Sequence, residues 1–237
     1  MQMWTVCGEK YTSCARSGGD MRKYISANRE KYSEFAPRVL QNHGNRAIII
    51  RKTRQEENDT VNIWHDIDPK RISPKDFIAY IEITKGQKQK YELDKETGML
   101  ILDRVLYTST HYPANYGFIP RTLSEDGDPL DVLVLCSEPI LNCSLVRCHP
   151  IGIIAMEDGG ELDEKIIALP FGDPTYAEFK SIHELPAHLT NEMMHFFTVY
   201  KELEGKKTFI SRSGGHKEAQ AVIEKCIAAY NEKYADK

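Results

Sequence analysis

Residues 124–135, SEDGDPLDVLVL, place four acidic side chains directly before an apolar run. The run over residues 131–135 predicts a buried strand, and the Gly and Pro before it are typical of a turn. Carboxylates this close repel one another and resist burial unless a cation is present. The stretch therefore indicates either a solvated turn before a core strand or a site for hard divalent cations, which prefer several carboxylate oxygens.

Apolar segments separated by turns continue on both sides of this stretch. Seven segments are rich in β-branched and aromatic residues, and a turn at residues 94–98 predicts a hairpin between two of them. Short strands punctuated by Gly and Pro favour a closed or strongly curved sheet, such as a small barrel. The predicted strands are residues 77–83, 90–93, 99–106, 131–135, 145–156, 165–170 and 207–211.

Two helices are predicted after most of these strands. Residues 191–204 carry apolar side chains at helical spacing, with Thr190 as the expected N-cap and Gly205 as the end signal. Residues 216–234 repeat apolar side chains three and four positions apart, which is typical of a helix packed on a core. The expected fold class is therefore mainly β with flanking helices (α+β).

The composition is that of a soluble globular protein rather than a disordered or membrane protein. Of the 237 residues, 41% are apolar and 28% are charged, and the longest aliphatic runs are too short to cross a bilayer. No secretory signal is recognised, and the six cysteines form no CxxC pair. These features predict a cytoplasmic protein with reduced thiols.

The net charge of −4 is unevenly distributed along the chain. Residues 1–54 carry 11 Lys and Arg against 4 Asp and Glu, so the remainder of the chain is strongly acidic. An acidic body favours metal cations over nucleic acid as partners. We expect residues 1–60 to be a basic, partly ordered extension and residues 61–237 to be a barrel domain with C-terminal helices. Organellar targeting by the basic segment is the alternative to a cytoplasmic location.

Polar side chains interrupt the apolar pattern of the predicted barrel. Lys90 and Glu92 alternate in one strand, so period-two geometry puts them on the same face. Each such residue alone is typical of a solvated surface. Together they offer carboxylates for divalent metals and Lys, Arg and Tyr for an oxyanion, the combination that phosphate bound to Mg²⁺ requires. The other polar residues of this candidate site are Glu82, Arg104, Asp158, Asp163, Lys165, Tyr200 and Lys201.

Residues 126–132, DGDPLDV, resemble the signature of family I soluble inorganic pyrophosphatases at every position. The resemblance covers about residues 62–205 in the right order and spacing. It implies an OB-like, five-stranded closed barrel that hydrolyses inorganic pyrophosphate to two orthophosphates. The other matching segments are residues 81–83, 90–95, 103–104, 111–120, 156–158, 163–165 and 196–201.

The resemblance also implies a role for each polar residue of the site. Asp128 is expected to act as the general base toward a water activated by Mg²⁺, and Glu82 to act mostly through metal-bound water. The expected metal ligands are Asp126, Asp131, Asp163, Asp158 and Glu92, with several Mg²⁺ ions per site and Mn²⁺ or Zn²⁺ as possible substitutes. The residues expected to hold the two phosphoryl groups are Lys90, Arg104, Tyr116, Lys165, Tyr200 and Lys201.

Two other functions remain open from the sequence alone. An aspartyl-phosphate-type phosphatase would use Asp126 as a nucleophile, although in such enzymes the buried strand precedes the acids rather than following them. A non-catalytic barrel would use the same acids to bind divalent cations. The expected partners are pyrophosphate and phosphate, without nucleic acid or membrane, and the resemblance implies a homo-oligomer, either a dimer or a hexamer.

Overall fold

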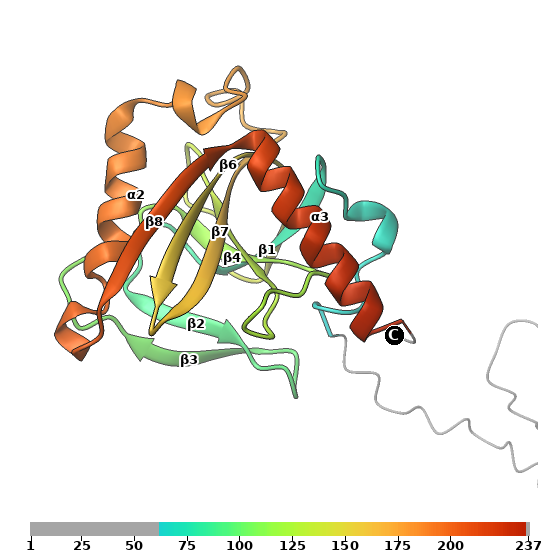
Figure 1. Cartoon of the computed structure of the whole chain (residues 1–237), viewed down its shortest axis with the longest axis horizontal. Coiled ribbons are helices and arrows are strands. Elements are labelled where there is room, and N and C mark those ends of the chain that lie inside the picture. Colours follow the sequence, from blue (N-terminus) through green and yellow to red (C-terminus); the bar gives the residue numbers. More distant parts are fainter. Residues whose placement is uncertain (1–61, 236–237) are drawn as a thin grey trace, which may run out of the picture. The chain divides into compact units, whose positions relative to one another are not determined.

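The structure is a computed structural model that describes residues 62–235 (Figure 1). The predictions for residues 1–60, a basic and partly ordered extension with a possible targeting role, lie outside these residues. Between residues 62 and 235, no helix combines the length and the apolar character needed to cross a membrane.

Five strands form a closed ring. Their order is β1–β4–β5–β7–β6, and the pairing of β6 with β1 closes it. All neighbouring strands in the ring are antiparallel except β5 and β7, which run parallel. This arrangement confirms the predicted mainly β fold with a five-stranded closed sheet. The strands are β1 (Phe77–Ile83), β4 (Asn115–Ile119), β5 (Leu130–Val134), β6 (Ser144–Asp158) and β7 (Glu161–Pro170).

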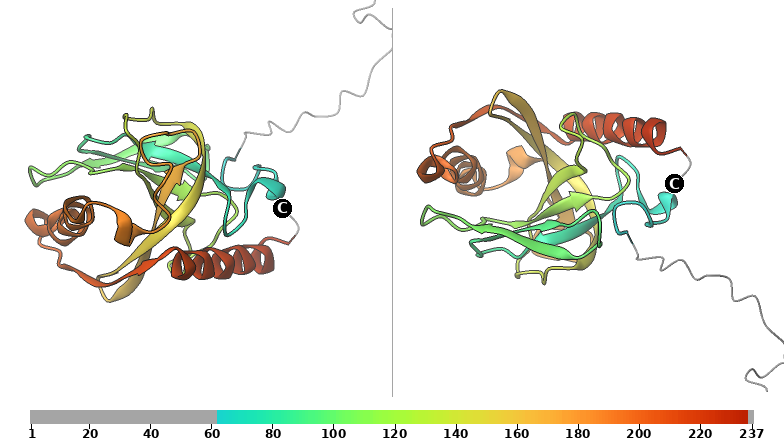
Figure 2. Two further views of the ribbon diagram at one scale, coloured as in Figure 1. Left: turned by 90° about the horizontal axis from the view of Figure 1, so that it is seen from above. Right: turned by 90° about the horizontal axis from the view of Figure 1, so that it is seen from below.

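Three further strands lie outside the ring. Strand β8 (Thr208–Gly215) pairs with β6 and extends the sheet, whereas β2 (Gln89–Leu93) and β3 (Leu100–Val105) form a separate hairpin. Figure 2 shows this curved sheet from two further sides, with the two long helices on its outside. All seven predicted strands are present, with their ends shifted by a few residues.

The ring contains one strand that the sequence did not predict, β4. Its five residues are all buried, so the strand shows no apolar–polar alternation. It also contains Asn115 and Gly117, and both residue types are depleted in strands. Gly117 is needed there because β4 approaches β1 very closely: a Cβ atom on Gly117 would lie 1.8 Å from the carbonyl oxygen of Tyr80.

This contact predicts the effect of one substitution in the fold. Gly117→Ala should lower the free energy of unfolding by about 3 kcal/mol, because the new methyl group would force β1 and β4 apart. Urea unfolding measures the change. The matched control is Gly172→Ala, where a Cβ meets no atom within 4 Å. Equal stabilities of the two variants would show that the β1–β4 approach does not require glycine.

The first long helix differs from its prediction. Helix α2 spans Ala187–Val199, not residues 191–204, and Pro186 rather than Thr190 occupies the N-cap. Proline lacks an N–H and has a fixed φ, so it is well tolerated at the start of a helix. After Val199 the chain leaves the α-helix and forms a short 3-10 turn, η4 (Glu202–Glu204), which ends at Gly205 with φ 73°. The helix prediction was therefore too late at both ends.

Helix α3 (His216–Lys233) confirms the second prediction within one residue, and the two helices cover different parts of the core. The buried face of α3, which includes Val222 and Ile223, belongs to an apolar cluster that also contains residues of β1, β4, β5, β6 and β7. The buried face of α2, which includes Phe196 and Phe197, packs on a second apolar cluster together with β4 and β7 residues. Short 3-10 turns complete the fold: η2 (Pro69–Arg71) and η3 (Ile182–Glu184).

Candidate active site

A buried lysine is the centre of a polar cluster formed by residues of β4, β5 and β7. The parallel register of β5 and β7 places Asp131 opposite Lys165. The Lys165 Nζ lies 2.6 Å from Asp131 Oδ2 and 2.9 Å and 3.0 Å from the two oxygens of Asp163. The Tyr116 hydroxyl, on β4, donates a hydrogen bond to Asp131. The structure thus brings together four residues predicted for the site around an ammonium group that is only 2% exposed.

The charges of this cluster are coupled. Burial alone would lower the pKa of Lys165, but the carboxylates of Asp131 and Asp163 overcome that effect and raise it well above its ordinary value. Burial raises the pKa of Asp131, and the Lys165 ammonium opposes the shift. Burial also raises the pKa of Asp126, to which the charges of Asp128 and Asp163 add. One ammonium therefore does not compensate the carboxylates around it, and the site favours an additional cation.

The loop before β5 carries Asp126 and Asp128 in different environments. The Asp126 side chain accepts a hydrogen bond from the Asp128 backbone N–H at 3.0 Å, and Gly127 adopts φ 88° in the tight turn between them. Asp128 points outward, with its side chain 55% exposed, and forms an ion pair with Lys95. The acids precede the buried strand, as the sequence predicted.

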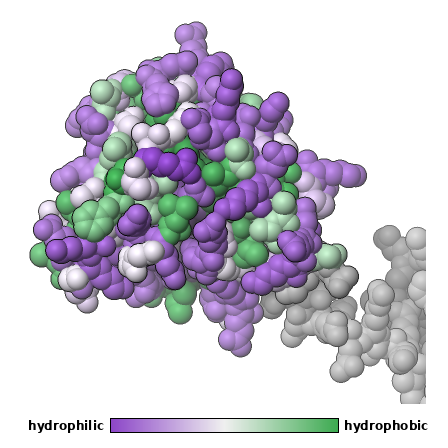
Figure 3. Space-filling model, in the orientation of Figure 1, coloured by the Kyte–Doolittle hydropathy of each residue, from purple (hydrophilic) through white to green (hydrophobic). Residues whose placement is uncertain are grey.

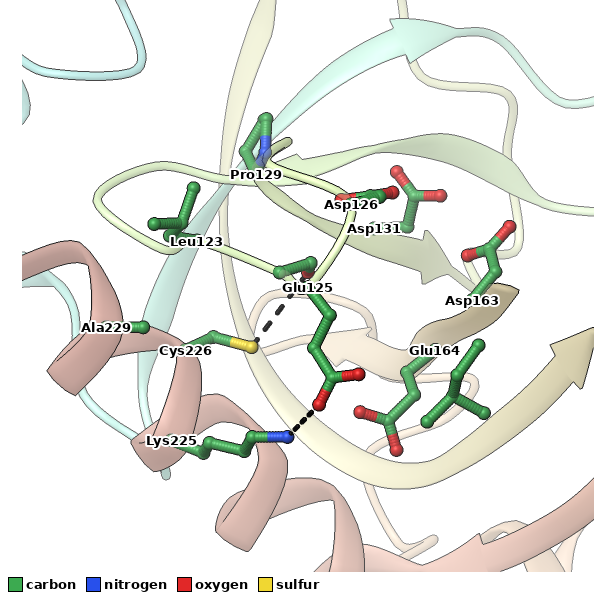
Figure 4. Close-up of a pocket in the computed structure, with 12 residues that line it drawn as sticks. Leu123, Glu125, Asp126, Pro129, Asp131, Asp163, Glu164, Lys225, Cys226 and Ala229 are labelled. Carbon is green, nitrogen blue, oxygen red and sulfur yellow. Dashed lines mark hydrogen bonds and ion pairs between the residues drawn. The ribbon is translucent and has the colours of Figure 1, made fainter. Parts of the chain in front are cut away.

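Asp126, Asp131 and Asp163 line one pocket of about 100 Å³ (Figure 4). Their carboxylate oxygens are the ligand type that Mg²⁺ and other hard divalent cations prefer. Across residues 62–235, no three or more His, Cys, Asp or Glu side chains are already gathered around a single metal position, because Asp131 and Asp163 bond to Lys165. The donor set nevertheless fits a hard divalent cation in its chemistry and charge.

The β2–β3 hairpin carries a second group of site residues. Lys90 lies opposite Arg104 in the strand pairing and forms an ion pair with Glu92. Arg104 bonds to its neighbour Asp103, and its Nε donates to Glu204 Oε1 at 3.0 Å. The hairpin thus presents an ammonium and a guanidinium group, the cations suited to phosphoryl oxygens.

A third group joins the end of β6 to the end of α2. Asp158 is the last residue of β6, and its carboxylate forms an ion pair with Lys201. Tyr200, the C-cap of α2, is buried. Burial raises the pKa values of Tyr200 and Tyr116 above those of free tyrosine. Both hydroxyls therefore stay protonated near neutral pH and can donate hydrogen bonds.

Glu82 lies in the barrel wall behind these groups. It is 7% exposed, and its Oε1 accepts a hydrogen bond of 2.7 Å from the Leu93 backbone N–H. Burial, with a contribution from the Asp131 charge, raises the pKa of Glu82 to about 8. Glu82 therefore carries a proton at neutral pH in the metal-free protein and connects the core strand β1 with the hairpin.

This raised pKa predicts a pH-dependent stability. The unfolded chain releases the Glu82 proton above about pH 4.5, whereas the folded protein keeps it up to about pH 8. The free energy of unfolding should therefore fall as the pH rises through this window, by at most ~1.4 kcal/mol per pH unit from this group. Glu82→Gln keeps an acceptor for Leu93 and does not titrate, so its stability should fall less steeply. Urea unfolding from pH 5 to pH 8 in EDTA measures both slopes, and equal slopes would refute the assignment.

Sequence reasoning gave no role to three residues that contact the predicted site residues. Asp103 forms an ion pair with Arg104. The sequence could have indicated it only as the neighbour of Arg104 in the matching segment 103–104. Glu204 holds the same guanidinium from 100 residues away, and Lys95 pairs with Asp128 from 33 residues away. Local sequence patterns carry no information on such distant pairs.

Comparisons with known proteins identify the family of this chain. Residues 79–231 match the family described as inorganic pyrophosphatase. The chain is 46% identical over 171 residues to soluble inorganic pyrophosphatase 2 of Chlamydomonas reinhardtii, covering 72% of this chain and 89% of that protein. It is 45% identical over 170 residues to the inorganic pyrophosphatase of Aquifex pyrophilus, covering 70% and 96%.

Solved structures of inorganic pyrophosphatases have a similar fold. The inorganic pyrophosphatase of Thermus thermophilus superposes with a TM-score of 0.69 at 36% identity, over 72% of this chain and 99% of that one. The enzyme of Helicobacter pylori gives a TM-score of 0.65 at 44% identity, over 67% and 95%.

The fold and the site together define a barrel protein in which carboxylates pair with Lys and Arg side chains. The chain belongs to the inorganic pyrophosphatase family of enzymes (inorganic diphosphatases). The resemblance of residues 126–132 to that family is thereby confirmed.

Proposed function

We propose that this protein hydrolyses inorganic pyrophosphate to two orthophosphates with Mg²⁺ as the activating metal. The observation that carries the proposal is the pocket shared by Asp126, Asp131 and Asp163, beside the buried Lys165. Pyrophosphate is a polyanion that requires both metal cations and Lys or Arg side chains for charge neutralisation. Membership of the pyrophosphatase family supports this substrate.

The metal-holding residues follow from the donor set. Asp126, Asp131 and Asp163 would hold the first Mg²⁺, and Asp158 and Glu92 would serve the ions that accompany the substrate. A bound divalent cation supplies Lewis acidity, which lowers the pKa of water toward neutrality and withdraws charge from phosphoryl oxygens. Mn²⁺ or Zn²⁺ can substitute, since both accept carboxylate ligands.

The cations of the hairpin and of α2 would bind the phosphoryl groups. Lys90, Arg104 and Lys201 come from separate elements, and each already faces a carboxylate that a polyanion can replace or bridge. Preorganised cations of this kind stabilise the charge that develops during phosphoryl transfer. Tyr116 and Tyr200 would donate hydrogen bonds to the phosphoryl groups. Lys165 would hold the carboxylates of Asp131 and Asp163 in place and contact the substrate. Glu82 would support the β2–β3 hairpin and act through metal-bound water.

Asp128 is the proposed general base. It lies between two metal-holding aspartates in the chain, yet its own carboxylate points outward and contacts Lys95. To accept a proton from the attacking water, this carboxylate would have to leave Lys95 and turn toward the metal-holding aspartates, and its exposure would let it pass the proton to solvent. The proposed step forms one phosphorus–oxygen bond to water, breaks the bridging phosphorus–oxygen bond, and transfers one water proton to Asp128.

The oligomeric state of the protein is a further part of the proposal. We propose a homo-oligomer, a dimer or a hexamer, and light scattering on the full chain measures its mass directly. A monomer at micromolar concentration would refute the proposal.

The experiment that separates this function from its alternatives is a quench-flow reaction with ³²P-labelled pyrophosphate and Mg²⁺. Direct attack by water predicts labelled phosphate and no protein-bound label at any time. Label trapped on Asp126 would instead support an aspartyl-phosphate-type phosphatase. Failure to release phosphate with Mg²⁺, Mn²⁺ or Zn²⁺ would leave a non-catalytic divalent-cation-binding barrel as the better description.

A further inference from the structure

A second pocket lies at the middle of β6, away from the active-site end of that strand. It has a volume of about 240 Å³ and is lined by six residues. Four of them are basic and come from different segments: Lys75 before β1, His149 on β6, Lys180 before η3 and His216 at the start of α3. Pro150 and Gln220 complete the lining. We call it the basic pocket.

The basic side chains of this pocket lack counter-ions. In the part of the chain that the structure describes, no carboxylate lies within ion-pair distance of any of the four. The Lys180 Nζ donates only to the Ala177 carbonyl oxygen, at 2.9 Å. By contrast, Lys90 and Arg104 of the β2–β3 hairpin share the Asp103 carboxylate. The basic pocket is therefore a concentration of positive charge in an otherwise acidic body.

Two acids close in the chain to Lys75 and Lys180 are already engaged in hydrogen bonds. Asp76 accepts two hydrogen bonds from Arg147, at 2.9 Å from Nε and 2.5 Å from Nη2. Glu184 accepts the backbone N–H of Lys180 at 2.6 Å. Burial and the Lys180 charge lower the pKa of His149, while the Asp76 charge opposes them. Burial is the largest cause of this shift, and the Lys180 charge adds to it.

We propose that the basic pocket binds a phosphate-type dianion, either free phosphate or the phosphate group of a small organic molecule, at a site separate from the active site. Two ammonium groups and two imidazoles supply the donors that recognise phosphate oxygens. Helix α3 begins at His216 without a side-chain cap, so its free N–H groups add donors, although Glu218 in the same turn is acidic.

The separation from the active site follows from β6 itself. His149 and Asp158 lie nine residues apart on this strand, which corresponds to about 30 Å of extended chain. Strand β8 pairs Thr208 with Asp158 and Gly215 with Gly152, so α3 begins beside the middle of β6, one strand length of β8 away from the β6–β7 hairpin (Figure 1). A phosphate group cannot contact both sites at once, so the basic pocket is a distinct binding site.

The test is an NMR titration of the full chain with inorganic phosphate, glycerol 3-phosphate or chloride at constant ionic strength. The reporters are the imidazole Cε1–Hε1 signals of His149 and His216, assigned through single His→Gln variants. We expect saturable chemical-shift changes with inorganic phosphate, with glycerol 3-phosphate or with both. The one with the lower dissociation constant shows whether the basic pocket prefers free phosphate or the phosphate group of an organic molecule. Lys75→Gln combined with Lys180→Gln should weaken this binding at least tenfold, whereas the exposed control pair Lys70→Gln and Lys217→Gln should not change it.

Several outcomes would overturn the proposal. They are the absence of saturable shifts up to tens of millimolar phosphate, equal shifts with chloride, or unchanged affinity in the Lys75→Gln, Lys180→Gln protein. Because the readout is binding at two named histidines, a protein without hydrolytic activity can still bind phosphate here. Conversely, an active pyrophosphatase can lack this site, so the two proposals fail independently.

Discussion

Asp128→Asn is expected to lower kcat for pyrophosphate hydrolysis by about 10²–10⁴-fold, the usual loss when a general base is removed. The amide keeps the size of the side chain but cannot accept the proton of the attacking water. The fold should survive, because the Asp128 side chain is 55% exposed and its one ion pair within residues 62–235 is with Lys95, which is 53% exposed. Steady-state phosphate release at saturating Mg²⁺, together with a circular dichroism melt, measures both properties.

The matched control for this variant lies in the same loop. Glu125 is 63% exposed and forms an ion pair with Lys225 on α3, so it resembles Asp128 in exposure and pairing. Glu125→Gln should therefore retain kcat within a factor of about two, since exposed ion pairs contribute little. An Asp128→Asn protein as active as Glu125→Gln would remove Asp128 from the mechanism and leave the proton to another group.

Lys165→Met is expected to lower the free energy of unfolding by about 3–5 kcal/mol in EDTA, because it leaves buried carboxylates without their cation. Lys165 is 2% exposed and bonds both Asp131 and Asp163. Methionine has a similar length and keeps the apolar packing, so most of the loss comes from charge. Urea unfolding measures the difference from the unaltered protein.

Divalent cations should reverse much of this loss. Millimolar Mg²⁺ supplies positive charge to the same carboxylates, so it should stabilise Lys165→Met more than the unaltered protein. Lys225→Met is the control: its ammonium is 59% exposed, and its removal should cost less than about 1 kcal/mol with or without Mg²⁺. Equal responses of the two variants to Mg²⁺ would mean that Asp131 and Asp163 do not hold the cation.

Much of the barrel could be predicted from local patterns. Strands with alternating or continuous apolar residues, such as β1 and β5, were recognised directly, and so was the periodic face of α3. Strand β4 was missed because its requirement for Gly117 arises from contact with β1, which only the folded sheet reveals. The predicted position of helix α2 was wrong because the sequence indicated Thr190 as the N-cap, whereas Pro186 is the N-cap and the helix begins at Ala187.

The site was predictable where the residues lie in one motif and less so where they meet across the fold. The signature at residues 126–132 identified the aspartates and their order before the buried strand. The pairs Lys95–Asp128 and Arg104–Glu204 join distant segments, so no spacing in the sequence indicates them. The basic pocket has the same property, since its four basic residues come from four separate segments.

The most direct test of the function is a steady-state assay of phosphate release from pyrophosphate as Mg²⁺ is varied from zero to millimolar concentration. We expect rapid release that requires Mg²⁺, saturates with it and disappears in EDTA. Asp131→Asn should show little release at any Mg²⁺ concentration, because it loses charge at the carboxylate nearest Lys165. Pyrophosphate left intact at every Mg²⁺ concentration, or hydrolysed equally well in EDTA, would show that this site is not a Mg²⁺-dependent pyrophosphatase.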